Sequence, residues 1–212
     1  MIKNNKTKLG IIGTGGFGRE VLQLALDIQN KMALFSKINF IMFDDFYENK
    51  YVDETEVIKI SNCNFKTTKF VIAIADPQLR KKIVNELPNE TMFTSLISPT
   101  AFVSNDLKFG DGLIVMPFSY LSCNVKLGEH VHINSHCAVG HDTKIGDFFT
   151  SASSVMIAGN NTIAECCYFG MNSSTKQGLK LSKNIKVGLN SGVVKDLNKS
   201  GTYFGTPAKF LF

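Results

Sequence analysis

The stretch VHINSHCAVGHDTKIGDF, residues 131–148, places Ile133, Val139 and Ile145 six residues apart. The same step runs from Ile97 to Val193 without a change of register, and 15 of its 17 positions hold an aliphatic residue or Phe. A period of six matches neither the 3.6-residue repeat of an amphipathic helix nor the two-residue alternation of a strand. The repeat therefore excludes a helical array and indicates a coiled column of short strands.

Each group of six residues supplies one short strand and one corner, so three groups complete a coil of 18 residues. The 17 groups span 102 residues, or 5.7 coils, and coils stacked at strand spacing give a column about 27 Å tall. We expect the large apolar side chains to fill the axis. Glycine follows the inward position at residues 110, 128, 140, 146, 170 and 188, and we expect glycine or another small residue to turn the corners.

Residues 8–96 lack this period and alternate between strand-like and helix-like segments. Apolar patterns predict strands over 8–12, 38–43, 70–75 and 91–97 and helices over 17–30 and 79–87. This alternation is typical of a small parallel sheet of the nucleotide-binding kind. We therefore predict two domains: a Rossmann-like α/β domain at 1–96 and a parallel β-helix with a C-terminal cap at 97–212.

Composition narrows the class of protein. The chain has 212 residues, 44% of them apolar and 19% charged, with a formal net charge of +5, which excludes a disordered, highly charged tail protein. Its basic residues are scattered, which argues against a nucleic-acid partner. It has no apolar run of about 18 residues, so we expect no membrane insertion. Five cysteines without an export signal predict reduced thiols and a cytoplasmic location.

The segment Gly13-Thr14-Gly15-Gly16-Phe17-Gly18 stands between a predicted strand and a predicted helix. In that context glycines let the backbone approach a phosphate at the helix N-terminus, although a merely tight turn would use the same residues. Asp44 and Asp45 follow the second predicted strand, at the edge where open α/β sheets bind ligands. They are either ligand acceptors or solvated turn residues. Arg80 is either a phosphate contact or a surface residue.

All four histidines lie between His130 and His141. A zinc site is the first alternative, because His136 and His141 have the spacing of γ-class carbonic anhydrases, but a third ligand is missing from the position two coils upstream. His141 points outward by the six-residue register, and Gly159, one coil further on, leaves space beside its ring for a ligand. Asp142 follows it and would fix the imidazole tautomer. We therefore predict a catalytic base at His141 and no metal.

Several motifs together resemble the sugar acyltransferases of the sialic acid O-acetyltransferase type and of the bacillosamine-pathway UDP-amino-sugar N-acetyltransferase type. They are the glycine loop 13–18, Phe43-Asp44-Asp45, the segments 133–142 and 145–148, and Gly205-Thr206-Pro207-Ala208-Lys209. The resemblance covers nearly the whole chain. It implies a left-handed β-helix, acetyl-CoA as donor and a homotrimer with the donor between adjacent columns.

The resemblance also implies residue roles. His141 would be the base and Asp142 its acidic partner, and Thr150, Met171 and Leu189 match positions that contact the donor. Thr150 departs from the histidine of the bacillosamine-pathway relative. The nucleotide would be held by Gly13, Gly15, Gly16, Phe17, Asp44 and Asp45.

These residues predict an acetyl-CoA-dependent N-acetyltransferase that acts on a nucleotide-linked amino sugar for surface glycan biosynthesis. O-acetylation of a sialic acid would use the same base and stays an alternative. A non-catalytic nucleotide-sugar-binding scaffold is the alternative from another class. We expect direct transfer, because neither Cys nor Ser stands beside His141 as an acyl-enzyme would need.

Overall fold

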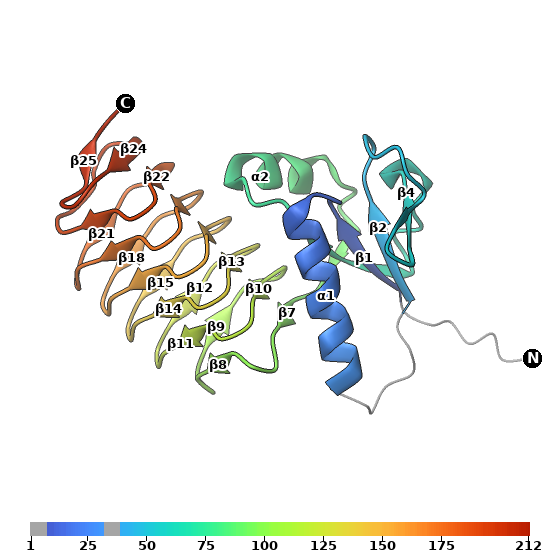
Figure 1. Ribbon diagram of the computed structural model, residues 1–212, viewed down its shortest axis with the longest axis horizontal. Helices are drawn as coiled ribbons and strands as arrows, with labels where there is room; N and C mark the ends of the chain where they lie inside the picture. Colours follow the sequence, from blue (N-terminus) through green and yellow to red (C-terminus); the bar gives the residue numbers. More distant parts are fainter. Residues whose placement is uncertain (1–7, 32–38) are drawn as a thin grey trace, which may run out of the picture.

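The computed structural model describes residues 8–31 and 39–212. It has a small α/β unit at one end of a long column of strands (Figure 1). No helix in the described ranges is long and apolar enough to cross a bilayer. The predicted combination of a small parallel sheet with a left-handed parallel β-helix is confirmed.

The α/β unit is built on one six-stranded sheet with the strand order β3-β4-β2-β1-β5-β6. Its pairs are parallel except β3 with β4. The elements in chain order are β1 (Lys8–Ile12), α1 (Gly16–Lys31), β2 (Asn39–Phe43), β3 (Tyr51–Val52), β4 (Thr55–Ile58), a 3-10 turn (Ile60–Asn62), β5 (Thr68–Ile72), α2 (Pro77–Glu86) and β6 (Met92–Phe93).

Three elements differ from the prediction. The third strand, β5, begins and ends earlier than 70–75. The segment predicted as one strand over 91–97 is two strands, of which β6 pairs in the α/β sheet and β7 (Leu96–Ile97) pairs in the column. The β3–β4 hairpin was not predicted, because its turn at Asp53, with φ 49°, has neither glycine nor proline to signal it.

The column has three parallel sheets, which we call its first, second and third faces. The first face is β7, β10 (Ile114–Val115), β13 (His132–Ile133), β16 (Thr150–Ser151), β19 (Tyr168–Phe169) and β22 (Ile185–Val187). The second is β8 (Phe102–Val103), β11 (Tyr120–Leu121), β14 (Ala138–Val139), β17 (Met156–Ile157), β20 (Ser174–Thr175) and β23 (Gly192–Val193). The third is β9 (Lys108–Phe109), β12 (Lys126–Leu127), β15 (Lys144–Ile145), β18 (Thr162–Ile163) and β21 (Lys180–Leu181).

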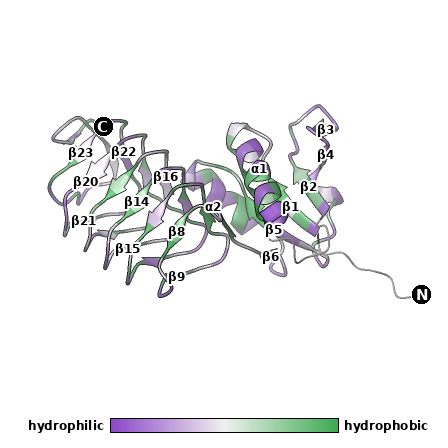
Figure 2. Cartoon of the chain, turned by 60° about the horizontal axis from the view of Figure 1, so that its bottom comes forward, coloured by the Kyte–Doolittle hydropathy of each residue, from purple (hydrophilic) through white to green (hydrophobic). Residues whose placement is uncertain are grey.

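The paired residues of adjacent coils are 18 apart, as in Leu121 with Val139 and Ile145 with Ile163. The inward residues form one continuous buried core along the axis, and hydrophobic and hydrophilic residues alternate along the column in Figure 2. Phe109 departs from this pattern and is 46% exposed, because no coil lies beneath the first one. The hairpin of β24 (Gly201–Phe204) and β25 (Lys209–Phe210) closes the other end.

The corners are not turned by the glycines that we expected. Positive φ angles recur every six residues from Phe118 to Asn190, nearly all at non-glycine residues such as Asp142 (φ 59°). The glycines after the inward positions have a different role. A Cβ on Gly140 would lie 2.5 Å from the amide nitrogen of Gly159 in the next coil, so these glycines allow adjacent coils to approach closely.

Arg80 of α2 joins the two parts of the molecule. Its guanidinium is fully buried and donates hydrogen bonds to the carbonyls of His130 and Phe148 and to the hydroxyl of Thr150, all in the column. Burial lowers the pKa of Arg80 to about 9. Neither alternative for this residue was right, since Arg80 is neither a surface residue nor free for a phosphate.

Candidate functional site

His141 lies at the corner between the second and third faces, between β14 and β15. Its side chain is 48% exposed, and its Nδ1 lies 2.7 Å from Oδ2 of Asp142. Asp142 occupies the left-handed corner position itself, which brings its carboxylate back toward the preceding side chain. A carboxylate on Nδ1 fixes the tautomer that leaves Nε2 as the free acceptor. The predicted outward direction of His141 and its pairing with Asp142 are therefore present in the structure.

Gly159 lies directly against this imidazole. A Cβ on Gly159 would lie 2.7 Å from Nε2 and 2.8 Å from Cε1 of His141. The missing side chain thus lets the imidazole lie against the backbone of Gly159, which stacks one coil further on, as the 18-residue register predicts. The backbone N–H of Asn160 donates to the carbonyl of His141 over 2.8 Å and ties the two coils together.

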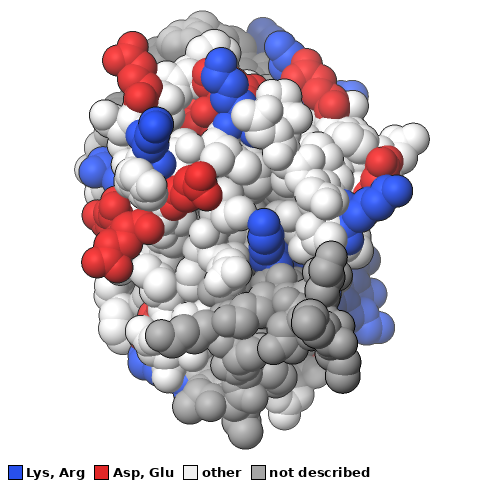
Figure 3. All heavy atoms as spheres, turned by 90° about the vertical axis from the view of Figure 1, so that its right-hand side faces the viewer, with Lys and Arg blue, Asp and Glu red and all other residues white. Residues whose placement is uncertain are grey.

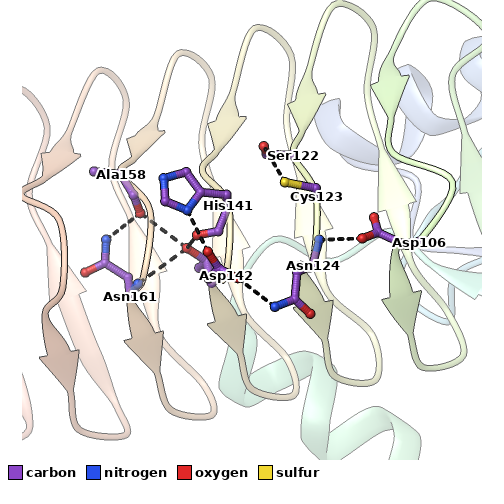
Figure 4. Close-up of polar contacts among 9 residues, drawn as sticks. Asp106, Ser122, Cys123, Asn124, His141, Asp142, Ala158 and Asn161 are labelled. Atoms are coloured by element: carbon purple, nitrogen blue, oxygen red, sulfur yellow. Dashed lines mark hydrogen bonds and ion pairs between the residues drawn. The ribbon is translucent and has the colours of Figure 1, made fainter.

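A buried amide holds the corner on which Gly159 lies. Asn161 is fully buried, and its Nδ2 donates to the carbonyl of Ala158 at 2.6 Å and to Oγ1 of Thr175 at 3.0 Å. Its Oδ1 accepts from the backbone N–H of Leu179. Figure 4 shows this amide beside the His141–Asp142 pair. Thr175 is one of two polar residues on the inward register. Its hydroxyl accepts this hydrogen bond, so it is not left without a partner in the core.

Sequence reasoning missed a further contact of the pair. Nδ2 of Asn124 donates to Oδ1 of Asp142 over 2.6 Å, and the backbone N–H of Asn124 donates to Oδ2 of Asp106 over 2.9 Å (Figure 4). The hydrogen bond from Asn124 is the largest cause that lowers the pKa of Asp142, followed by the bond to His141. The signal was available, because Asn124 precedes Asp142 by one coil of 18 residues.

The residues predicted to contact the donor lie at three different places. Met171 and Leu189 are 58% and 57% exposed, at the corner between the first and second faces. Gly159 lies at the corner of His141. Thr150 is buried on the first face, where its hydroxyl donates to the carbonyl of Ala75 and accepts from Arg80. The side chain of Thr150 is therefore engaged within the chain, and a single chain does not bring these four residues together.

The other histidines do not join His141. His136 is exposed at the corner between the first and second faces, where it packs against Phe118. His130 and His132 are buried under the α/β unit. Among the residues that the structure describes, no three His, Cys, Asp or Glu side chains are grouped as a metal site would need.

The glycine loop is shaped for close backbone approach. Gly13 has a φ of 108°, and a Cβ on Gly18 would lie 2.1 Å from the carbonyl oxygen of Gly13, so both positions require glycine. Nothing lies within 4 Å of the Cβ positions of Gly15 and Gly16, which face open space. Phe17 turns away from this opening and packs against His132 of the column.

The two aspartates hold the glycine loop and the 3-10 turn that follows β4. Oδ2 of Asp44 accepts from the hydroxyl of Thr14 at 2.6 Å and from its N–H at 3.2 Å. Asp45 accepts from the backbone N–H of Ile60. Beside them is a cavity of about 300 Å³. Its lining is Ile12, Gly13, Phe43, Asp44, Asp45, Phe46, Ile60, Ile74, Leu79, Ile83, Glu86 and Leu87.

This cavity combines apolar walls with carboxylates and the backbone of Gly13, which suits a nucleobase and its ribose. No column residue lines it, so one chain does not join it to His141. Acidic and basic side chains are mixed on the face drawn in Figure 3, which agrees with the scattered charges of the sequence.

Comparison with known proteins gives three kinds of similarity. A family model described as the PglD N-terminal domain matches residues 8–87. GDP-perosamine N-acetyltransferase of Escherichia coli O157:H7 is 30% identical over 175 residues, which are 80% of this chain and 78% of that protein. WeeI from Acinetobacter baumannii AYE superimposes with a TM-score of 0.88 at 28% identity, over 96% of this chain and 99% of that one.

A further solved structure shares the fold. The acetyltransferase domain of PglB from Neisseria gonorrhoeae FA1090, in complex with acetyl coenzyme A, superimposes with a TM-score of 0.87. Its identity is 24%, over 97% of this chain and 100% of that one.

Proposed function

The chain belongs to the hexapeptide-repeat sugar acyltransferases, and from this premise we propose that it transfers an acetyl group from acetyl-CoA to the amino group of a nucleotide-linked amino sugar. The observation that carries the proposal is the exposed His141–Asp142 pair, whose imidazole lies against Gly159. The relative from Escherichia coli, named as an N-acetyltransferase of a GDP-linked sugar, supports an amine as the acceptor.

In the proposed reaction the sugar amine attacks the thioester carbonyl carbon while Nε2 of His141 takes the amine proton. Asp142 stabilises the imidazolium through its 2.7 Å contact with Nδ1. The N–H of Gly159 is the candidate donor to the oxyanion of the tetrahedral intermediate. When the C–S bond breaks, the CoA thiolate leaves and recovers the proton from His141. No covalent acyl-enzyme is needed, and the imidazole lies against Gly159 and points away from Cys123 (Figure 4).

The proposed nucleotide site is the cavity beside Gly13, with the open backbone of Gly15 and Gly16 for the phosphates and Asp44 and Asp45 at the sugar or base. Phe17 has a supporting role in this proposal, because its ring packs against the column.

We further propose a homotrimer with the donor between columns. Two observations support it. The proposed donor contacts Met171 and Leu189 lie at a different corner from His141, so a neighbouring chain is needed to bring such a corner to this base. The second face also exposes apolar side chains, with Phe102 58% and Tyr120 46% exposed and their rings stacked at 5.0 Å.

The decisive experiment incubates the protein and acetyl-CoA with a panel of acceptors and measures their mass. The panel holds GDP-, UDP- and dTDP-linked amino sugars and free sialic acid. The gain of one acetyl group on an amino sugar is the expected result. Acetylation of sialic acid alone would establish the O-acetyltransferase instead. Calorimetry with CoA is the companion measurement, since a scaffold without catalysis would bind the nucleotide sugar and not CoA.

A further inference from the structure

The corner of His141 contains a hydrogen-bonded series that extends beyond the catalytic pair. Asp106, Asn124 and Asp142 are 18 residues apart and stack on successive coils. Oγ of Ser104 donates to Oδ1 of Asp106 at 2.6 Å. Oδ2 of Asp106 accepts from the backbone N–H of Asn124, whose side chain donates to Oδ1 of Asp142.

The series is directional. The amide of Asn124 reaches one oxygen of Asp142 at 2.6 Å, and the other oxygen is the one that contacts Nδ1 of His141 at 2.7 Å. A carboxylate held at both oxygens cannot rotate about its terminal torsion without losing one of them. Among the described residues, Asn124 and His141 are the two side chains that hydrogen-bond to the Asp142 carboxylate. The orientation of the acid therefore depends on Asn124.

The same stacking of polar corner residues also occurs where there is no base. Nδ2 of Asn172 donates to Oδ1 of Asn190 at 2.7 Å, at the corner between the first and second faces. That pair links two coils through neutral amides. At the corner of His141, by contrast, the acceptor is a charged carboxylate with an imidazole on its second oxygen. A hydrogen bond to a charged acceptor is the stronger kind, and here it acts on the group that orients the base.

We propose that Asn124 is a positioning residue for the acetyl transfer, which orients the Asp142 carboxylate toward Nδ1 of His141. Because its side chain is neutral, it also adds no second negative charge next to that carboxylate. This inference rests on the proposed function, since it gives Asn124 a part in the same reaction. It assigns Asn124 no contact with either substrate. The expected effect is therefore on kcat and on its pH dependence, with KM values for both substrates nearly unchanged.

The test compares Asn124→Asp with Asn124→Ala. Aspartate is compatible with the left-handed backbone of this position, where φ is 54°, but it replaces the donor by a second carboxylate next to Asp142. Added negative charge favours the protonated imidazole, so the acidic limb of the kcat profile should move to higher pH and kcat at pH 7 should fall about tenfold. Alanine removes the donor without adding charge, so it should lower kcat with a smaller displacement of the limb.

Asn184→Asp is the matched control. Asn184 is an exposed corner residue with φ 59°, at the corner between the third and first faces, where its Oδ1 accepts from Gln78. The substitution adds the same charge to the same backbone conformation away from His141. It should leave kcat and the pH profile at their wild-type values. Thermal unfolding of all three variants shows that each one folds.

The outcomes separate this inference from the proposed function. If folded Asn124→Asp keeps the wild-type kcat and pH profile while the wild-type protein acetylates an amino sugar, Asn124 has no positioning role. If the displacement also occurs in Asn184→Asp, the effect is general electrostatics and the inference fails as well. If the wild-type protein acetylates no member of the acceptor panel, the proposed function itself fails.

Discussion

His141 and His130 stand eleven residues apart in the same repeat, yet they are placed in opposite environments. His141 is about half exposed and has a carboxylate on Nδ1. His130 is 2% exposed, stacks on Phe148 at 5.4 Å, meets the edge of Phe93 and has an unpartnered Nδ1. The difference follows from the corner that each one occupies, because the α/β unit covers the corner between the third and first faces and leaves the corner of His141 open.

This contrast separates the proposed catalytic histidine from a structural one. The buried environment favours the neutral imidazole, and burial followed by the charge of Arg80 lowers the pKa of His130 to about 4. His132 is buried nearby, and its pKa is lowered for the same reasons. Histidines that cannot hold a proton at neutral pH suit an apolar contact between two parts of a molecule, whereas an exposed histidine with an acid on one nitrogen suits proton transfer.

The largest expected effect is on catalysis at the exposed histidine. His141→Ala removes the proposed base and should lower kcat by a factor of about 100 or more, while the melting temperature stays near that of the wild type because the side chain packs against no core. Steady-state kinetics with an acceptor from the panel measures the change. His130→Phe, assayed beside it at pH 7.5, should keep most of its activity. If kcat fell by a comparable factor in both variants, the proposal that only the exposed histidine acts in catalysis would be wrong.

The second expected effect is on stability at the buried histidine. In the unfolded chain His130 titrates near its ordinary value of 6.5, and in the folded chain near 4. Between these values the unfolded state binds more protons, so the free energy of unfolding falls as the pH decreases. This one group accounts for about 2 kcal/mol between pH 7 and pH 5. The stability that folding gains by keeping His130 neutral is fully present above pH 6.5 and is lost as the pH falls toward 4.

His130→Phe tests that contribution. Phe118 and Phe148 already occupy equivalent corner positions with φ of 62° and 57°, so the backbone at residue 130 accepts this side chain. The variant should lose less stability than the wild type between pH 7 and pH 5 when unfolding in urea is measured at both values. Part of the slope should remain, because His132 still titrates. An unchanged slope would show that His130 is not the neutral, buried group described above.

The comparison also shows how far the sequence predicts this molecule. The six-residue period predicts the column and its 18-residue coil, and that register places Gly159 against His141. The same arithmetic applied to Asp142 would have found Asn124. The sequence could not predict that Arg80 and Thr150 bond to each other, since residues 70 apart meet only when α2 docks on the column. Nor does a local pattern tell which corner the α/β unit covers, so the burial of His130 and His132 beneath it could not be predicted.

The smallest expected effect tests the close contact between the base and Gly159. Gly159→Ala would place a Cβ 2.7 Å from Nε2 of His141, and the exposed imidazole would turn aside at little cost in stability. Because Gly159 does not have a positive φ, alanine fits its backbone. A displaced base should lower kcat about tenfold. Cys123→Ala, on the opposite neighbouring coil, removes atoms rather than adding them and should retain wild-type kcat. If Gly159→Ala were fully active, the position of the imidazole against Gly159 would not be the one from which His141 takes the proton, and the ring would have to act from another orientation.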